Sequence, residues 1–281
     1  MGPDRVADAA PLVPDAVRAA LAGVVPTGLG RVEVVPRTGS TSSDLVAAAT
    51  ADPVAWPDRS VLVTDHQTAG RGRSGRTWET PAGEALTFSV LLRPRVPADR
   101  LGWLPLLGGL AVVRALEDLG VEAGLKWPND VLVVDAAEHL PGWGRHRKVA
   151  GVLGELGADA AVLGIGVNVH QRTLPVPSAT SLAVCGITVP RSVLLATVLA
   201  ELVALDERWR AADGDASAVE LAAECAAVCL TLGAQVRVSR PGGAVLTGHA
   251  IGLSDHGALR VADDDGHVHV VLAGDVEHLR A

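Results

Sequence analysis

Short apolar runs alternate with longer periodic stretches over residues 1–231 of the chain. Apolar runs bounded by turn residues predict buried strands, and apolar residues that recur every three or four positions predict helices. The predicted strands cover residues 32–36, 60–65, 85–93, 148–156 and 160–169, with a strand–turn–strand over 124–135.

The longer stretches predict helices. One begins at Ser42, Ser43 or Asp44, because short side chains with an oxygen accept hydrogen bonds from the first helical N–H groups. Another ends at Gly120, a residue type suited to a helix C-terminus. The predicted helices cover residues 15–22, 42–49, 101–119, 193–211 and 216–229. Loops are predicted at 136–147 and 175–186, with a tight turn at 157–159.

The pattern changes after Thr231, where alternating apolar and polar residues form short runs separated by PGG, SDHG and DDDG. This pattern predicts a small all-β unit. We therefore expect two domains, residues 1–231 and 232–281. The predicted strands of the second are residues 234–240, 245–253, 258–263 and 267–272.

Composition narrows the class of protein. The net charge of −8 disfavours broad binding to nucleic-acid phosphates. No run of about 18 apolar residues predicts a membrane span, and acidic Asp4 and Asp8 do not suit a secretory signal. We therefore expect a cytoplasmic protein.

The three cysteines predict no disulfide framework, and Cys225 and Cys229 are expected as small buried residues on one helix face rather than metal ligands.

Lysine and asparagine are rare, and the few present occur in candidate motifs. Only two of the 24 basic residues are lysines, Lys126 and Lys148, and the chain has two asparagines, Asn129 and Asn168. A lysine retained where arginine is otherwise used suggests a need for a compact ammonium group, although chance placement is the simpler alternative. These four residues are therefore candidate site residues.

The stretch QTAGRGRSGRTWET, residues 67–80, combines three glycines with three arginines. It could be a solvated loop, a nucleic-acid-binding Arg-Gly segment or a cradle for an anionic ligand. Because it follows a buried strand and contains Trp78 within the body of the domain, a ligand loop is favoured. It matches neither a Walker loop nor a dinucleotide-binding fingerprint. Glycines within the strands at 148–156 and 160–169 also permit close ligand approach.

Several segments, in this order, resemble the catalytic domain of biotin–protein ligases: GSTSSD (39–44), QTAGRGRSGRTW (67–78), KWPND (126–130), KVAGVLGE (148–155) and GIGVNV (164–169). The segment from 232 resembles that family's SH3-like barrel. The resemblance implies an α+β fold: a class II synthetase-like catalytic domain with a mixed β-sheet flanked by helices, and a small C-terminal β-barrel. It also implies a monofunctional enzyme, because the sequence ahead of residue 30 is too short for a DNA-binding head.

The resemblance also assigns roles to residues. Lys148 and Arg73 are the implied catalytic residues. The implied biotin contacts are Ser40, Thr41, Ser42, Gln67, Gly70, Arg71, Gly72, Arg73, Lys148, Gly151 and Gly166. The implied ATP and adenylate contacts are Arg71, Arg73, Trp78, Lys126, Asn129, Asp130, Lys148 and Asn168. Two positions depart from the family pattern: Ser42 replaces an asparagine, and Ser74 replaces an arginine found in some members.

The implied reaction joins biotin to ATP as biotinyl-5′-AMP and then transfers biotin to a lysine of a biotin carboxyl carrier protein. Mg²⁺ is expected on the ATP phosphates, with no protein metal site. Nucleic acid and membrane are not expected partners, and a monomer or weak homodimer is expected. A lipoate–protein ligase is the alternative, although no stretch resembles that family's Arg-Arg-x-Ser-Gly-Gly-Gly loop.

Overall fold

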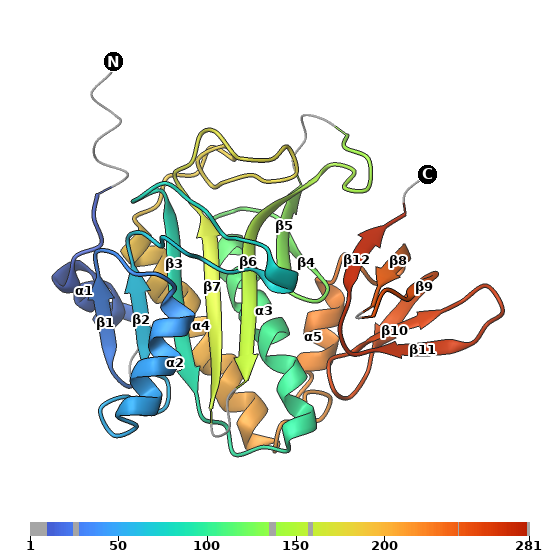
Figure 1. The fold of residues 1–281 in the computed structure, drawn as a ribbon, viewed down its shortest axis with the longest axis horizontal. Helices are drawn as coiled ribbons and strands as arrows, with labels where there is room; N and C mark the ends of the chain where they lie inside the picture. Colours follow the sequence, from blue (N-terminus) through green and yellow to red (C-terminus); the bar gives the residue numbers. More distant parts are fainter. Residues whose placement is uncertain (1–9, 25–27, 135–138, 157–159, 241, 280–281) are drawn as a thin grey trace. The chain divides into compact units, whose positions relative to one another are not determined.

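The computed structural model describes residues 10–24, 28–134, 139–156, 160–240 and 242–279 (Figure 1). These residues belong to two compact units. One contains the chain up to Pro94 and Val149–Val203, and the other contains Arg95–Lys148 and the chain from Ala204. The turn predicted at 157–159 and the first residues of the predicted loop at 136–147 lie outside the described residues. The predicted domain boundary between residues 231 and 232 stays a prediction.

A mixed sheet has the strand order β1-β2-β3-β7-β6-β5-β4. Strands β1 and β2 are parallel, whereas the pairs β2–β3, β3–β7 and β7–β6 are antiparallel. This confirms the predicted α+β class with a mixed sheet. The strands of this part are β1 (Val32–Val35), β2 (Val61–Thr64), β3 (Ala85–Leu92), β6 (His146–Leu156) and β7 (Ala161–Asn168).

Helix α2 (Thr41–Ala51) packs on the face of the sheet seen in front in Figure 1. Its N-cap is Ser40, whose hydroxyl accepts a hydrogen bond from the N–H of Ser43. The predicted N-caps Ser42, Ser43 and Asp44 were therefore wrong, since the helix begins earlier and takes these residues into its first turn. The helix is held by a buried apolar cluster of Leu45, Ala49, Trp56, Leu62, Leu91 and Val162.

Helices α1 (Pro14–Val24) and α4 (Arg191–Ala211) contain the stretches where helices were predicted. The buried Arg191 at the start of α4 donates to the carbonyl oxygen of Ala85 at 3.1 Å and to Asp65 at 2.7 Å. A guanidinium group has five N–H donors, so it can hydrogen-bond to several chain segments at once. The start of α4 is thereby tied to the end of β2 and the start of β3. Residues 175–186 are irregular, as predicted.

The second unit contains a hairpin of β4 (Ala123–Lys126) and β5 (Asp130–Val134), next to which α3 (Leu104–Glu117) packs. The single helix predicted at 101–119 is in fact a 3₁₀ segment, Ala98–Trp103, followed by α3, whose C-cap is Asp118 rather than Gly120. The predicted helix at 216–229 is also shorter: α5 spans Leu221–Ala227, and Cys229 lies beyond its end. None of the three cysteines, all of which lie in the described part of the chain, forms a disulfide.

A separate antiparallel sheet follows, in the order β11-β10-β9-β8-β12. Four of its strands match the predicted ones, and β12 was missed because its polar sequence Asp275–His278 has little apolar alternation. The strands are β8 (Gln235–Ser239), β9 (Val245–Leu253), β10 (Leu259–Ala262), β11 (Val268–Val271) and β12 (Asp275–His278). Among the described helices, none is long and apolar enough to cross a membrane.

Candidate active site

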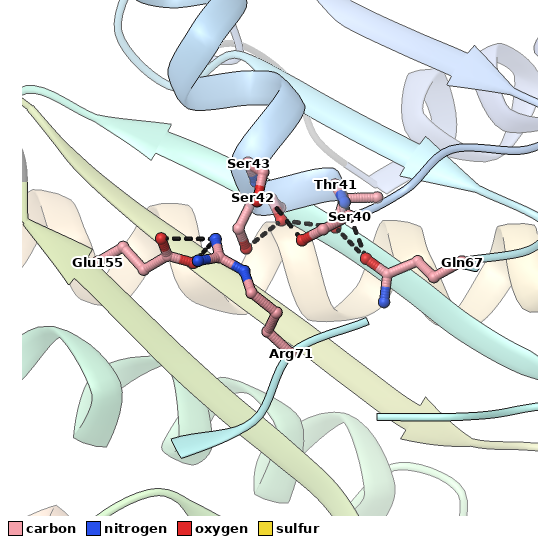
Figure 2. Close-up of polar contacts among 8 residues, drawn as sticks. Ser40, Thr41, Ser42, Ser43, Gln67, Arg71 and Glu155 are labelled. Carbon is pink, nitrogen blue, oxygen red and sulfur yellow. Dashed lines mark hydrogen bonds and ion pairs between the residues drawn. The ribbon is translucent and has the colours of Figure 1, made fainter. Parts of the chain in front are cut away.

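A chain of hydroxyl groups lies at the start of α2 (Figure 2). Ser42 Oγ lies 3.0 Å from Ser89 Oγ, Ser89 Oγ donates to Thr41 Oγ1 at 2.7 Å, and Thr41 Oγ1 donates to Gln67 Oε1 at 3.1 Å. The backbone N–H of Thr41 donates to the same Gln67 oxygen at 2.8 Å. Because each hydroxyl has one proton, Ser42 must donate to Ser89, and all protons point toward Gln67.

The backbone N–H of Thr41 determines how the Gln67 amide is oriented, because an N–H group can only donate and therefore requires the amide oxygen as its partner. The Gln67 oxygen accepts two hydrogen bonds from Thr41, so its Nε2 group is the end turned away from α2, toward residues 70–78, the Gly/Arg loop (Figure 2). Gln67 is buried, and a side chain at Gly70 would come within 2.8 Å of Nε2. The arrangement therefore presents two amide N–H donors at the loop, suited to an uncharged acceptor oxygen.

Ser89 was not named by the sequence analysis, although it is central to this hydroxyl chain. It is fully buried on β3, and the only signal was a serine within the apolar run ALTFSVLL. Ser42 also faces inward: a side-chain carbon at Gly164 would lie 2.5 Å from its Oγ. Its hydroxyl is thus used within the protein, and a ligand contact of Ser42 stays a prediction.

The Gly/Arg loop, residues 70–78, is closed on itself as a small hairpin. Trp78 N–H donates to the carbonyl oxygen of Gly70 at 2.9 Å, and Gly72 N–H donates to that of Arg76 at 2.7 Å. A 3₁₀ turn, Arg73–Gly75, forms the tip, with Ser74 at a φ of 56°. Gly70 must be glycine here because any side chain would collide with the carbonyl oxygen of Trp78.

The arginines of this loop differ in their surroundings. Arg71 Nη2 donates to both carboxylate oxygens of Glu155 on β6, at 2.6 and 2.7 Å (Figure 2). Arg73 is half-buried, and Arg76 is exposed. Glu155 was part of a quoted motif, but sequence reasoning gave it no role. A carboxylate would repel an anionic ligand, and the sequence does not show that this one is paired with Arg71.

The strand glycines are approached by the protein's own side chains. A side-chain carbon at Gly166 would lie 2.7–2.9 Å from the indole of Trp78, and Gly166 pairs directly with Gly151 across β6 and β7. The Trp78 indole can therefore approach this part of the sheet closely, because Gly166 has no Cβ to displace it. The ligand contacts of Gly151 and Gly166 stay predictions, and the contact that the structure places at Gly166 is the Trp78 ring.

Asn168 lies at the end of β7 and is buried. Its Nδ2 group donates to the carbonyl oxygen of Thr180 at 2.9 Å, and its Oδ1 accepts from Gln171 at 3.0 Å. These bonds tie the segment after β7 to the strand. Because one N–H and one lone pair of the amide remain for other contacts, the nucleotide role of Asn168 stays a prediction.

In the second unit, the KWPND motif forms the turn between β4 and β5. Lys126 and Asp130 are directly paired across the hairpin, and Asn129 N–H donates to the carbonyl oxygen of Lys126 at 3.2 Å. Lys148, in the first residues of β6, forms an ion pair with Asp130 at 2.6 Å. The structure therefore brings together four of the predicted nucleotide residues: Lys126, Asn129, Asp130 and Lys148.

The C-terminal sheet helps to hold this turn. Trp127 is buried, and its backbone N–H donates to Thr231 Oγ1 at 3.0 Å. Its indole N–H donates to the carbonyl oxygen of Gly257 at 3.0 Å. Thr231 Oγ1 is in turn 3.0 Å from His278 Nε2 on β12. The position of the KWPND turn within this unit therefore depends on residues far away in sequence.

A separate group of metal-ligand types lies at the turn between β10 and β11. Asp263, Asp265 and His267 could share one ion among the residues that the structure describes. A hydrogen bond from His269 lowers the pKa of Asp263. These residues belong to none of the matched motifs.

Two domain families match the chain. The biotin/lipoate A/B protein ligase family matches residues 34–171, and the biotin protein ligase C-terminal domain matches residues 231–279. The first match contains every predicted site residue.

Individual relatives agree. The biotin–[acetyl-CoA-carboxylase] ligase of Mycobacterium tuberculosis is 42% identical over 90% of this chain and 91% of its own length. The bifunctional ligase/repressor BirA of Bacillus subtilis is 30% identical, with 79% of this chain and 66% of its own length covered. A biotin protein ligase from Aquifex aeolicus, solved in complex with biotin and ATP, has a TM-score of 0.72 at 30% identity and covers 90% of this chain and 100% of its own.

The family match over residues 34–171 and the 42% identical relative show that the protein is a ligase. The chain belongs to the biotin protein ligase family.

Proposed function

We propose that this protein uses ATP to attach biotin to a lysine of a biotin carboxyl carrier domain through biotinyl-5′-AMP. The observation that supports it most is the pair of hydrogen bonds from Thr41 to the Gln67 oxygen, which leaves the Gln67 amide nitrogen turned toward the loop of Arg71. Thr41 and Gln67 together suit the uncharged ureido group of biotin. Family membership and the Aquifex aeolicus relative in complex with biotin and ATP support the same reaction.

In the first step, an oxygen of the biotin carboxylate attacks the α-phosphorus of ATP. The bond from that phosphorus to the bridging oxygen breaks, and pyrophosphate leaves with the bonding electrons. Because two anions must approach each other, cationic side chains offset their repulsion and the charge of the transition state. Lys148 and Arg73 are assigned this role, with support from Lys126. The ion pair between Lys148 and Asp130 keeps the ammonium group in a defined position.

In the second step, the ε-amine of the carrier lysine attacks the acyl carbon of the mixed anhydride. An amide forms, AMP leaves, and the amine loses a proton. Water would hydrolyse the same anhydride, so the loop of Arg71 and Arg73 must cover it until the carrier arrives.

Mg²⁺ fits this proposal as a companion of ATP. The KWPND turn offers one carboxylate, Asp130, and this carboxylate is already paired with Lys148 at 2.6 Å. A single carboxylate suits a Mg²⁺ ion whose other ligands are phosphate oxygens and water. When bound, the metal would offset phosphate charge. The proposal also includes an SH3-like closure of the C-terminal sheet and a monomer or weak homodimer.

The test is transfer of biotin to a purified carrier domain, followed by mass spectrometry. We expect one biotin adduct on one lysine, only when ATP is present. The same reaction with lipoate in place of biotin tests the lipoate ligase alternative. A lipoyl adduct without a biotinyl adduct would overturn the proposal. So would the absence of any adduct in an assay in which an active relative, used as the positive control, does modify the carrier domain.

A further inference from the structure

Ser89 lies at the centre of the hydroxyl chain at the start of α2, although it is outside the five sequence segments that resemble the family. It is fully buried on β3, directly opposite Gly164 on β7. A side-chain carbon at Gly164 would lie 2.5 Å from Ser42 Oγ and 3.5 Å from Ser89 Oγ. The glycine therefore leaves the space in which the two serine hydroxyls meet at 3.0 Å.

The direction of each proton in this chain follows from Gln67. The backbone N–H of Thr41 can only donate, so its partner at 2.8 Å is the amide oxygen, Gln67 Oε1. The Thr41 hydroxyl, 3.1 Å from that oxygen, gives its single proton to it, because the oxygen can only accept. Ser89 Oγ, 2.7 Å from Thr41 Oγ1, must then donate to Thr41. The proton of the Thr41 hydroxyl is thus committed, and Ser89 keeps it so.

The committed protons give the Thr41 and Gln67 side chains a fixed polarity. Thr41 Oγ1 gives up its proton and accepts once from Ser89, so among the bonds made by the described residues one lone pair remains on it. Gln67 Nε2, in contrast, only donates. An acceptor beside a donor complements an N–H group next to a carbonyl oxygen, which is the arrangement within a ureido group. An oxygen in place of that N–H would face a lone pair of Thr41.

We propose that Ser89 is a positioning residue that determines specificity for biotin: it holds the Thr41 hydroxyl as an acceptor for a ureido N–H. The inference rests on the proposed function and adds to it a buried residue that acts through Thr41. Without Ser89, the Thr41 hydroxyl is released to rotate and donate, because the backbone N–H still satisfies Gln67 Oε1. The preference for N–H over oxygen in the ligand therefore depends on Ser89.

The test compares biotin with its two cyclic carbamate analogues, in each of which one ureido N–H group is replaced by oxygen. Isothermal titration measures the affinities of the original protein and of Ser89→Ala. We expect Ser89→Ala to bind biotin about fivefold more weakly and to lose about tenfold of the original preference for biotin over at least one carbamate. A general loosening of the site would weaken both ligands equally and leave this preference unchanged.

Ser60→Ala is the matched control. Ser60 is fully buried in the same unit, at the other end of β2 from Gln67. Its hydroxyl donates to the carbonyl oxygen of Pro57 at 2.7 Å and accepts from the N–H of Arg31 at 3.2 Å. This variant also removes a buried hydroxyl with two hydrogen bonds, but it should change neither the biotin affinity nor the preference.

An unchanged preference in Ser89→Ala would overturn the inference, as would an equal loss of preference in Ser60→Ala. If Ser89→Ala does not fold, Ser89→Cys decides the question. Its thiol is a weaker donor than a hydroxyl, so we expect a smaller loss of the same preference, and an unchanged preference would again overturn the inference. Failure of the original protein to bind biotin would instead contradict the proposed function.

Discussion

Both carboxylate oxygens of Glu155 accept a hydrogen bond from the same nitrogen of Arg71, at 2.6 and 2.7 Å. The pair connects the Gly/Arg loop to strand β6. The Arg71 side chain is 46% exposed, and an exposed ion pair contributes only about 0–1 kcal/mol to global stability. Its effect should therefore be local, on the position of the loop.

Replacing Glu155 by Gln should loosen the loop without unfolding the protein. We expect trypsin to cleave after Arg71, Arg73 or Arg76 several-fold faster, because cleavage requires local opening. The urea midpoint should change little. Digestion followed by mass spectrometry measures the rate, and Glu117→Gln, at an exposed position on α3, is the control. Equal cleavage rates in all three proteins would show that the pair does not restrain the loop.

Lys148→Ala should abolish the first chemical step. Removing a cation that stabilises transition-state charge costs on the order of 10²-fold or more in rate, and here the partner Asp130 would also be left without its lysine. Pyrophosphate release in the presence of biotin and ATP measures this step alone. Release at a rate near that of the original protein would refute the assignment of Lys148.

Arg73→Gly should affect retention of the intermediate more than its formation. A loop that covers the adenylate less well would release biotinyl-5′-AMP, which then labels bystander lysines. Biotin labelling of added albumin measures the leak. Arg76→Gly in the same loop is the matched control, because Arg76 is exposed. If Arg73→Gly labels only the carrier domain, the retention role is wrong.

Thr231→Val should destabilise the second unit. Valine is similar in shape but cannot accept the hydrogen bond from the buried N–H of Trp127, and an unsatisfied buried donor costs about 1–3 kcal/mol. Urea denaturation measures the free energy of unfolding. Thr247→Val, at an exposed position of β9, should cost much less. A loss no larger than that of Thr247→Val would mean that the hydrogen bond to Thr231 contributes little.

The cysteines should differ in reactivity. Burial raises the pKa of Cys225 to about 12 and also raises that of Cys229, so both remain thiols at pH 8, while the reactive species is the thiolate. Cys185 is exposed. Iodoacetamide at pH 8 should therefore modify Cys185 first, and Cys225 and Cys229 only when urea unfolds the protein. Peptide mass spectrometry assigns the sites, and early modification of Cys225 would contradict its burial.

The sequence alone was sufficient for most elements and for the family. Strands such as β3 and β7 are continuous apolar runs, and their pattern does not depend on distant residues. The same pattern failed at helix ends. Ser40 rather than Ser42 caps α2, and α5 begins only at Leu221, because an alanine-rich stretch favours helix without specifying where it begins.

Motif order likewise identified the Gly/Arg loop, the KWPND turn and the rare lysines as candidate site residues. These are local patterns, in which the residue types by themselves indicate the chemistry of the site. The roles of their partners could not be predicted this way. Ser89 lies in an ordinary apolar run and Glu155 at the end of a quoted motif, but no local pattern indicates which side chain either of them meets.

Only the tertiary structure decided which groups meet. It directed the hydroxyl chain toward Gln67, gave Arg71 the carboxylate of Glu155 and placed Lys126 over Trp143. Each of these contacts depends on a distance of a few ångströms between residues separated along the chain, which depends in turn on strand register and on the turn that carries each residue. Residue type and order thus determined the class of chemistry, and packing determined which side chains are oriented to perform it.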